Sequence, residues 1–191
     1  MADIDFTKPK LRKALEQAEE MIVDGYRILR DEVGADNPAD NAFLREARIC
    51  AEAKLIWVGD RGGADGLTKS GDEVEIKSTR LIEGKSMHFP TSRSVSPTVI
   101  SRFRKATFWL FGVFDVYQEL IAIYRVEAAD VAELIDELER KMKQRKAQRR
   151  GEENNPKWSF AAVRPKAKRL FLHPDFIEDE DPTRGWTLRP R

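Results

Sequence analysis

The stretch GADGLTKSGDEVEIK, from Gly63 to Lys77, decides the fold of this chain. It reads as two extended segments joined by a turn at residues 69–72, because serine, glycine and aspartate are typical turn residues. Side chains alternate between the two faces of a strand, so Glu75 and Lys77 point the same way. A hairpin closed near Ser70 would bring Asp65 back beside Glu75.

Such a hairpin places two carboxylates and one ammonium at one point. Mg²⁺ prefers oxygen ligands and is held by one or two carboxylates together with water and a substrate phosphate. The pattern is therefore typical of Mg²⁺-dependent phosphodiester hydrolysis, with Asp65 and Glu75 as metal ligands and Lys77 orienting the attacking water. The alternative is a surface hairpin with a cross-strand Glu–Lys pair, worth at most ~1 kcal/mol. The hairpin motif alone leaves both interpretations open.

Length and composition favour a single domain with a substantial core. The chain has 191 residues, of which 35% are charged, and a net charge of +1, which argues against indiscriminate coating of nucleic acid. Cys50 is the one cysteine, so it indicates a reducing compartment and a buried core position. With two histidines, His88 and His173, a tetrahedral zinc site is disfavoured. No apolar run approaches the ~20 residues that span a bilayer, and the N-terminus does not resemble a signal peptide.

Hydrophobic periodicity predicts an α/β domain in which strands mix with packed helices. The segment 107–114 is apolar on both faces and should be the central buried strand. We expect helices at 11–33, 42–55, 97–105 and 128–146, and strands at 55–58, 64–68, 73–81, 107–114, 117–126, 158–163 and 170–172. The remaining tail is acidic and then basic, which predicts a surface location.

The hairpin segment GADGLTKSGDEVEIKST resembles the active-site hairpin of the PvuII type II restriction endonuclease family, with the same spacing and no gap. The resemblance continues in SPTVISRFR (96–104), ELIAIYRVE (119–127) and ENNPK (153–157), and covers about residues 40–169. It implies a PD-(D/E)xK restriction-endonuclease-like fold with a central mixed β-sheet flanked by helices. The implied activity is Mg²⁺-dependent double-strand cleavage of a short palindromic DNA site that leaves 5′-phosphate ends. Asp65, Glu75 and Lys77 would be catalytic, with two Mg²⁺ ions per active site held by Asp65 and Glu75.

The resemblance also predicts the organisation and partners of the chain. We expect a single endonuclease domain over 1–191, with a helical dimerisation segment at 8–34, a catalytic and DNA-recognition core at 40–172 and a surface tail at 175–191. The family forms a homodimer around double-stranded DNA, which suits a palindrome because identical half-sites meet identical surfaces. The alternative is a first helix that packs on its own sheet. A cytoplasmic enzyme is expected, without membrane contact, whose site is protected by a cognate methyltransferase that does not bind this chain.

DNA-binding residues follow from the same resemblance. Asp40 and Asn41 match a pair near the minor groove, although Asp40 could simply be an N-cap. Asn154 and Asn155 match a base-contacting pair, since amides donate and accept together, and Lys157 follows them. The loop over 86–97 departs from the family, which has three histidines there. Its candidate DNA contacts are Ser86, His88, Ser92, Arg93 and Ser94.

The side chains of the 86–97 loop bear on which bases the recognition sequence contains. Arg93 suits the paired acceptors of guanine, whereas the alternative is a flexible serine-rich loop. The site itself therefore stays open. Phe103 stands where the family has a tyrosine near the active site. The competing functions are a structure-specific PD-(D/E)xK DNA nuclease of repair or recombination and a non-catalytic DNA-binding module. The intact set of Asp65, Glu75 and Lys77 argues against the second of these.

Overall fold

The computed structural model describes residues 4–27, 42–58, 63–83, 85–92, 95–148, 156–181 and 185–191. The helices within these ranges are α1 (Pro9–Arg27), α2 (Ala42–Ala53), α3 (Pro97–Lys105), α4 (Ala128–Ala147) and the short α5 (Phe160–Val163). The strands are β1 (Ile4–Asp5), β2 (Ile56–Trp57), β3 (Gly66–Leu67), β4 (Glu73–Arg80), β5 (His88–Pro90), β6 (Phe108–Phe114), β7 (Leu120–Glu127), β8 (Lys157–Ser159), β9 (Lys168–Leu172), β10 (Phe176–Asp181) and β11 (Gly185–Pro190).

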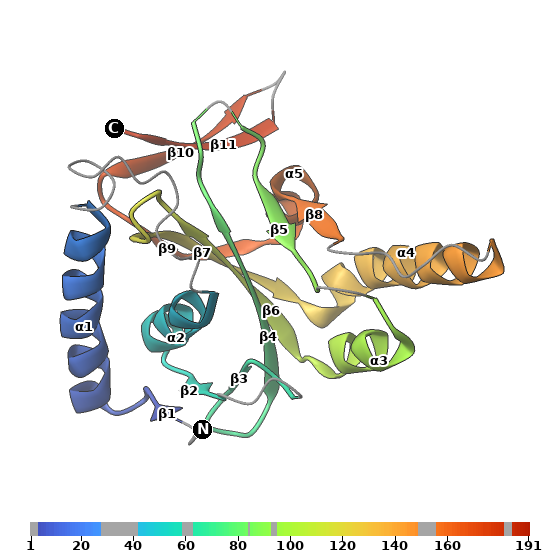
Figure 1. Ribbon diagram of the computed structural model, residues 1–191, viewed down its shortest axis with the longest axis horizontal. Coiled ribbons are helices and arrows are strands. Elements are labelled where there is room, and N and C mark those ends of the chain that lie inside the picture. The colour runs from blue at the N-terminus through green and yellow to red at the C-terminus, as the bar shows by residue number, and fades with distance from the viewer. Residues whose placement is uncertain are drawn as a thin grey trace.

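A mixed seven-stranded sheet organises the molecule, in the order β1-β2-β3-β4-β6-β7-β9 (Figure 1). Strands β4 and β6 are parallel, with Glu75 opposite Trp109, and the other neighbours are antiparallel. Every residue of β6 is buried, which confirms the prediction of a central strand. The mixed sheet flanked by helices confirms the predicted fold class.

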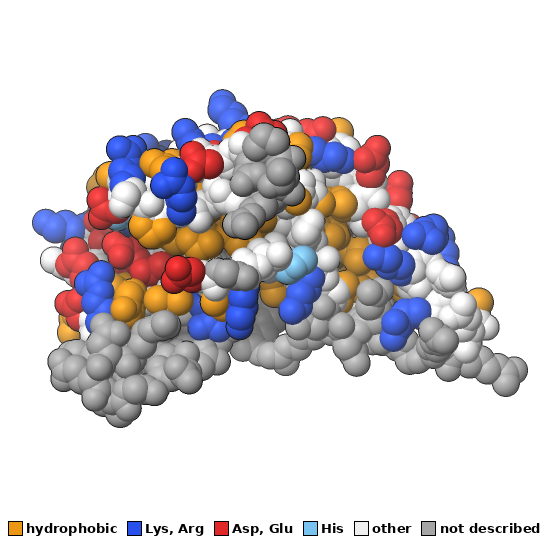
Figure 2. All heavy atoms as spheres, turned by 90° about the horizontal axis from the view of Figure 1, so that it is seen from above, with side chains coloured by type: hydrophobic (Ala, Val, Ile, Leu, Met, Phe, Trp, Pro, Cys, Tyr) orange, Lys and Arg blue, Asp and Glu red, His pale blue; other side chains and the backbone are white. Residues whose placement is uncertain are grey.

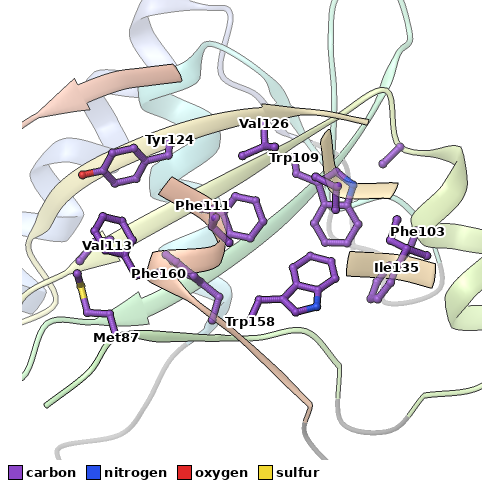
Figure 3. Close-up of a cluster of buried hydrophobic side chains, with 14 of the residues drawn as sticks. Met87, Phe103, Trp109, Phe111, Val113, Tyr124, Val126, Ile135, Trp158 and Phe160 are labelled. Atoms are coloured by element: carbon purple, nitrogen blue, oxygen red, sulfur yellow. The ribbon is translucent and has the colours of Figure 1, made fainter. Parts of the chain in front are cut away.

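The two faces of the sheet carry different cores. On one face Val74 and Ile76 of β4 pack with Ile49 and Cys50 of α2. The other core is larger and aromatic, and in Figure 3 side chains from β6, β8 and α3 point toward one another. Within it the ring centroids of Trp109 and Trp158 lie 5.0 Å apart. Because residues alternate along β4, Glu75 and Lys77 face this aromatic side.

Two predicted strands depart furthest from their expected bounds in the structure. The strand expected from residue 117 begins at Leu120, because the Asp115 carboxylate accepts hydrogen bonds from the backbone N–H groups of Tyr117 and Glu119, both at 2.8 Å. The strand expected over 158–163 ends at Ser159, whose hydroxyl caps α5 by accepting a hydrogen bond from Ala162 N–H at 3.2 Å. In both places a polar side chain satisfies backbone donors locally and so ends the extended conformation.

Residues 175–191, which the sequence predicts as a surface tail, contain two strands that the sequence analysis did not identify. These strands, β10 and β11, form a hairpin in which Leu188 is buried against the aromatic core. The carboxylate of Glu178 anchors β10 by accepting hydrogen bonds from Tyr124 Oη at 2.8 Å, from Arg169 at 2.9 Å and from Arg164. The charge pattern of this segment therefore reflects ion pairing within the fold.

Helix α1 begins at Pro9, two residues earlier than expected, and residues 28–41 lie outside the described ranges. Val23 is buried and Leu15 packs on the core, so one face of the helix covers its own chain. The opposite face is open, with Met21 78% exposed. None of the described helices has the length and apolar character needed to cross a membrane.

Candidate active site

The hairpin of β3 and β4 forms as the turn residues predict. Gly66 pairs with Val74, and Asp65 N–H donates to the Val74 carbonyl at 3.1 Å, which sets Asp65 beside Glu75. Gly71 takes the left-handed conformation, with φ of 90°, that a tight reversal requires. The Asp72 carboxylate accepts hydrogen bonds from the hydroxyls of the turn, so Asp72 holds the turn and is not merely solvated.

Asp65, Glu75 and Lys77 converge as the sequence predicted. Lys77 Nζ lies 2.5 Å from Glu75 Oε1 and 3.5 Å from Asp65 Oδ2. Asp65 Oδ2 also accepts a hydrogen bond from Ile76 N–H at 2.7 Å, which fixes the carboxylate against β4. The Glu75 side chain is 1% exposed and that of Lys77 is 10% exposed. The two carboxylates thus face the same point inside the protein.

A second cation, which sequence reasoning missed, reaches the same carboxylate. Arg102 of α3 donates through Nη2 to Glu75 Oε1 at 2.9 Å. Helix α3 is positioned by Ser96, whose hydroxyl accepts a hydrogen bond from Val99 N–H, and by Pro97 in its first turn. The signal available in the sequence was the neighbouring Phe103, which stands where the family places an active-site tyrosine.

Burial and charge act against each other at these groups. Burial raises the pKa of Glu75, although Lys77 and Arg102 oppose it. Burial also disfavours the charged form of Lys77, but the carboxylates of Asp65 and Glu75 outweigh it and raise the pKa of the ammonium. In this arrangement Lys77 is therefore held as an ammonium cation by the two carboxylates.

Glu46 of α2 is a further carboxyl that the sequence reading did not single out. Burial, reinforced by the charge of Asp65, raises its pKa to about 7. Its sequence signal is its place one turn before Cys50 on a helix whose Ala47 and Ala51 are buried. It adds a titratable group beside the hairpin.

The donor set fits Mg²⁺. Two carboxylates that contact the same ammonium supply the hard oxygen atoms that this ion prefers, and one or two such ligands suffice when water and phosphate complete the shell. Across the described ranges, no group of three or more His, Cys, Asp or Glu side chains lies close enough together to hold a metal ion. Asp65 and Glu75 are therefore a pair that depends on further ligands from water or substrate.

Two of the predicted DNA-binding segments meet in a small ribbon. Strands β5 and β8 pair antiparallel, with His88 opposite Ser159 and Pro90 opposite Lys157. His88 and Lys157 are exposed, whereas the alternate residues Phe89 and Trp158 are buried. The sequence predicts a loop over residues 86–97, whereas the structure has strand β5 within it. The strand forms because Phe89 packs in the aromatic core.

The other predicted contacts divide into two groups. Ser86 is exposed and Ser92 is half-buried, both next to β5. The remaining candidates lie outside the described residues: Asp40, Asn41, Arg93, Ser94, Asn154 and Asn155. Seen in Figure 2, Lys and Arg side chains on the face shown are interspersed with acidic ones and do not form one basic patch. Electrostatics on that face thus do not single out a DNA surface.

A mixed sheet flanked by helices, with paired carboxylates and a lysine on a hairpin, defines a restriction-endonuclease-like protein. The family model for restriction endonuclease PvuII matches residues 17–171. The chain belongs to this family of DNA-binding nucleases. No curated protein is similar enough to the chain to add to this assignment.

Proposed function

We propose that this protein is a homodimeric, Mg²⁺-dependent type II restriction endonuclease that cleaves both strands of a short palindromic DNA site. The observation that carries the proposal is the contact of Asp65 and Glu75 with one ammonium, Lys77, on the hairpin shared with the family. An inert hairpin gains little from a glutamate buried to 1% exposure beside a second carboxylate, because a buried ion pair is seldom more stabilising than apolar residues of similar volume.

In the proposed reaction Asp65 and Glu75 hold the cofactor, for which we expect two Mg²⁺ ions per site. When bound, Mg²⁺ polarises the phosphoryl oxygen and makes a water molecule more acidic. Lys77, held by both carboxylates, orients the attacking water and offsets charge that develops on phosphorus. The water oxygen forms a bond to phosphorus as the bond to O3′ breaks in line with it. One proton of the water ends on O3′ and the other stays on the oxygen that has joined phosphorus, so the products are a 3′-hydroxyl and a 5′-phosphate.

Assembly as a dimer would present two such sites to the two strands. The exposed residues of α1 are mostly charged or polar but include the apolar Leu11 and Met21, which a second copy of the chain would cover in the proposed dimer. The β5–β8 ribbon would carry His88 and Lys157 toward DNA. Arg93 and Asn154, predicted from the sequence as DNA contacts, come shortly after β5 and shortly before β8 in the chain. Loop Ser86–Ser96 and loop Asn154–Asn155 would together set the choice of bases.

Digestion of a plasmid of known sequence tests the proposal. The purified wild type should give discrete bands in Mg²⁺, and sequencing their ends should reveal one palindrome with 5′-phosphates. Asp65→Asn and Glu75→Gln should stop cleavage while gel shifts in Ca²⁺ still show DNA binding. Lys77→Ala should lose most activity without rescue in Lys77→Arg, because guanidinium is larger and planar.

Digests of plasmid and of branched DNA, together with the binding assay, separate the two alternative functions. Cleavage of branched or flapped DNA with an uncut plasmid would indicate a structure-specific nuclease. Binding without nicking in Mg²⁺ would indicate a non-catalytic DNA-binding module. Retained cutting by the Asp65 or Glu75 variant would remove that residue from the metal site.

A further inference from the structure

Two cations share one buried carboxylate oxygen in this protein. Lys77 Nζ and Arg102 Nη2 lie 2.5 Å and 2.9 Å from the same atom, Glu75 Oε1. An oxygen that accepts from both has little capacity left for a metal ion, and both cations repel one. Metal binding through Glu75 Oε1 therefore requires at least one of these contacts to lengthen.

Arg102 is the cation that can leave. Its side chain is 24% exposed, against 10% for Lys77, and Lys77 has Asp65 as a second partner. Its Nε is buried and finds no acceptor among the described residues, so the contact with Glu75 leaves part of the guanidinium unsatisfied. The Phe103 ring, 5.3 Å from the guanidinium carbon, offers only a π face on that side.

The group that suits a released guanidinium is a phosphate. Guanidinium donates two parallel hydrogen bonds to paired anionic oxygens, and a phosphodiester presents them where the metal site binds its substrate. Resting on the proposed function, we propose that Arg102 has two alternating partners. Without metal, the Arg102 guanidinium pairs with the Glu75 carboxylate. Once a divalent ion binds this carboxylate, the guanidinium donates to a non-bridging oxygen of the scissile phosphate.

Two alternating partners predict that replacing Arg102 raises the affinity for metal and lowers the rate of cleavage. Removing the guanidinium removes a competitor of the metal, so affinity for metal rises in the absence of DNA. The same change removes a donor from the phosphate, so cleavage slows when metal is saturating. A side chain that merely kept Glu75 in place would weaken both together.

The test compares the full-length wild type with Arg102→Gln, Arg102→Lys and the control Arg104→Gln. Arg104 lies on the same helix but pairs with Asp136 and Glu139 of α4. Mn²⁺ affinity is measured without DNA by electron paramagnetic resonance. Single-turnover cleavage is measured on plasmid DNA at saturating Mg²⁺ and enzyme, and thermal unfolding checks each fold.

We expect Arg102→Gln to bind Mn²⁺ about tenfold more tightly, because a competing cation is gone. Its cleavage should fall by about a hundredfold, which is typical for loss of one transition-state donor. Arg102→Lys should keep wild-type Mn²⁺ affinity but cleave slowly, since an ammonium cannot make the paired contact. Arg104→Gln should match the wild type in both measurements.

Equal Mn²⁺ affinity in Arg102→Gln and the wild type would overturn the competition, and unchanged cleavage would overturn the phosphate contact. A loss of both together with a lower unfolding temperature would show a structural role and overturn the proposal. A wild type that binds Mn²⁺ but does not cut DNA would overturn the proposed function and with it the phosphate contact. The Mn²⁺ comparison would still decide whether Arg102 competes with the metal.

Discussion

Asp65 has two tasks in the structure, and a pair of substitutions separates them. Its Oδ2 accepts a hydrogen bond from Ile76 N–H at 2.7 Å and lies 3.5 Å from Lys77 Nζ, with the side chain 17% exposed. Asp65→Ala removes both the charge and the acceptor. Asp65→Asn removes the charge but keeps an oxygen that can accept from Ile76. Both variants should lose the metal, and Asp65→Ala should also weaken the hairpin.

The magnitudes follow from these contacts. A largely buried backbone donor left without a partner costs ~1–3 kcal/mol, so Asp65→Ala should lower the free energy of unfolding by ~2–3 kcal/mol once the weaker pairing of Lys77 is included. Asp65→Asn should stay within ~1 kcal/mol of the wild type, because a neutral acceptor replaces a charged one. A metal concentration of about ten times the Kd should stabilise the wild type by ~1.4 kcal/mol and neither variant.

Urea denaturation followed by tryptophan fluorescence, in EDTA and in Mg²⁺, measures these differences. The protein concentration is held constant because a dimer would make the unfolding free energy depend on it. Asp179 pairs with Arg189 on the C-terminal hairpin, so Asp179→Asn serves as a matched control. This variant should respond to Mg²⁺ like the wild type. Equal destabilisation by Ala and Asn in EDTA would refute the hydrogen-bond argument. A full Mg²⁺ response in either variant would refute the role of Asp65 as a ligand.

Three further predictions concern stability and assembly. Burial raises the pKa of Glu19 from 4.5 to about 7, so the folded protein binds this proton more tightly than the unfolded chain and loses stability as the pH rises from 4.5 to 7. In urea denaturation, Glu19→Gln should therefore be more stable than the wild type by up to ~3 kcal/mol at pH 8 and should show no gain at pH 4. A Cβ on Gly112 would lie 2.3 Å from Ile49 Cδ1, so Gly112→Ala should lower the free energy of unfolding by ~1–3 kcal/mol. Because Ile49→Ala removes the clashing atom, the double mutant should lose less stability than the sum of the two single mutants. Met21→Glu should dissociate the proposed dimer in light scattering, and a monomeric wild type at micromolar concentration would contradict the dimer.

Local patterns predicted the catalytic hairpin because its determinants are close in sequence. Turn residues at 68–72 and the alternation of Val74 and Ile76 with Glu75 and Lys77 fix the register within fifteen residues. The central strand 108–114 was equally accessible, since apolar side chains on both faces indicate burial on both faces. The resemblance to the family supplied the roles of these residues, which local pattern alone left open.

Contacts across long sequence distances could not be predicted in the same way. Arg102 reaches Glu75 only because α3 packs on the sheet, with Phe103 against Trp109 of β6. In the sequence, an arginine in a short helix looks like an ordinary solvated residue. The C-terminal hairpin depends on Glu178 meeting Tyr124 and Arg164 from other elements. Glu46 could have been suspected from its place on a half-buried helix face, but its neighbours Asp65 and Lys77 follow from tertiary structure.

The charges of the catalytic hairpin bear on the order of events at the site. When both carboxylates are ionised, Asp65 and Glu75 balance Lys77 and Arg102, so these four ion-paired groups carry no net charge without metal or DNA. A divalent ion added to this cluster leaves an excess of positive charge inside the protein, which is unfavourable unless an anion enters with it. The phosphate of DNA is that anion, and coupling of two ligands is reciprocal, so metal favours DNA as much as DNA favours metal. In the proposed mechanism, two cations on one buried carboxylate would therefore keep metal binding weak until the DNA backbone arrives.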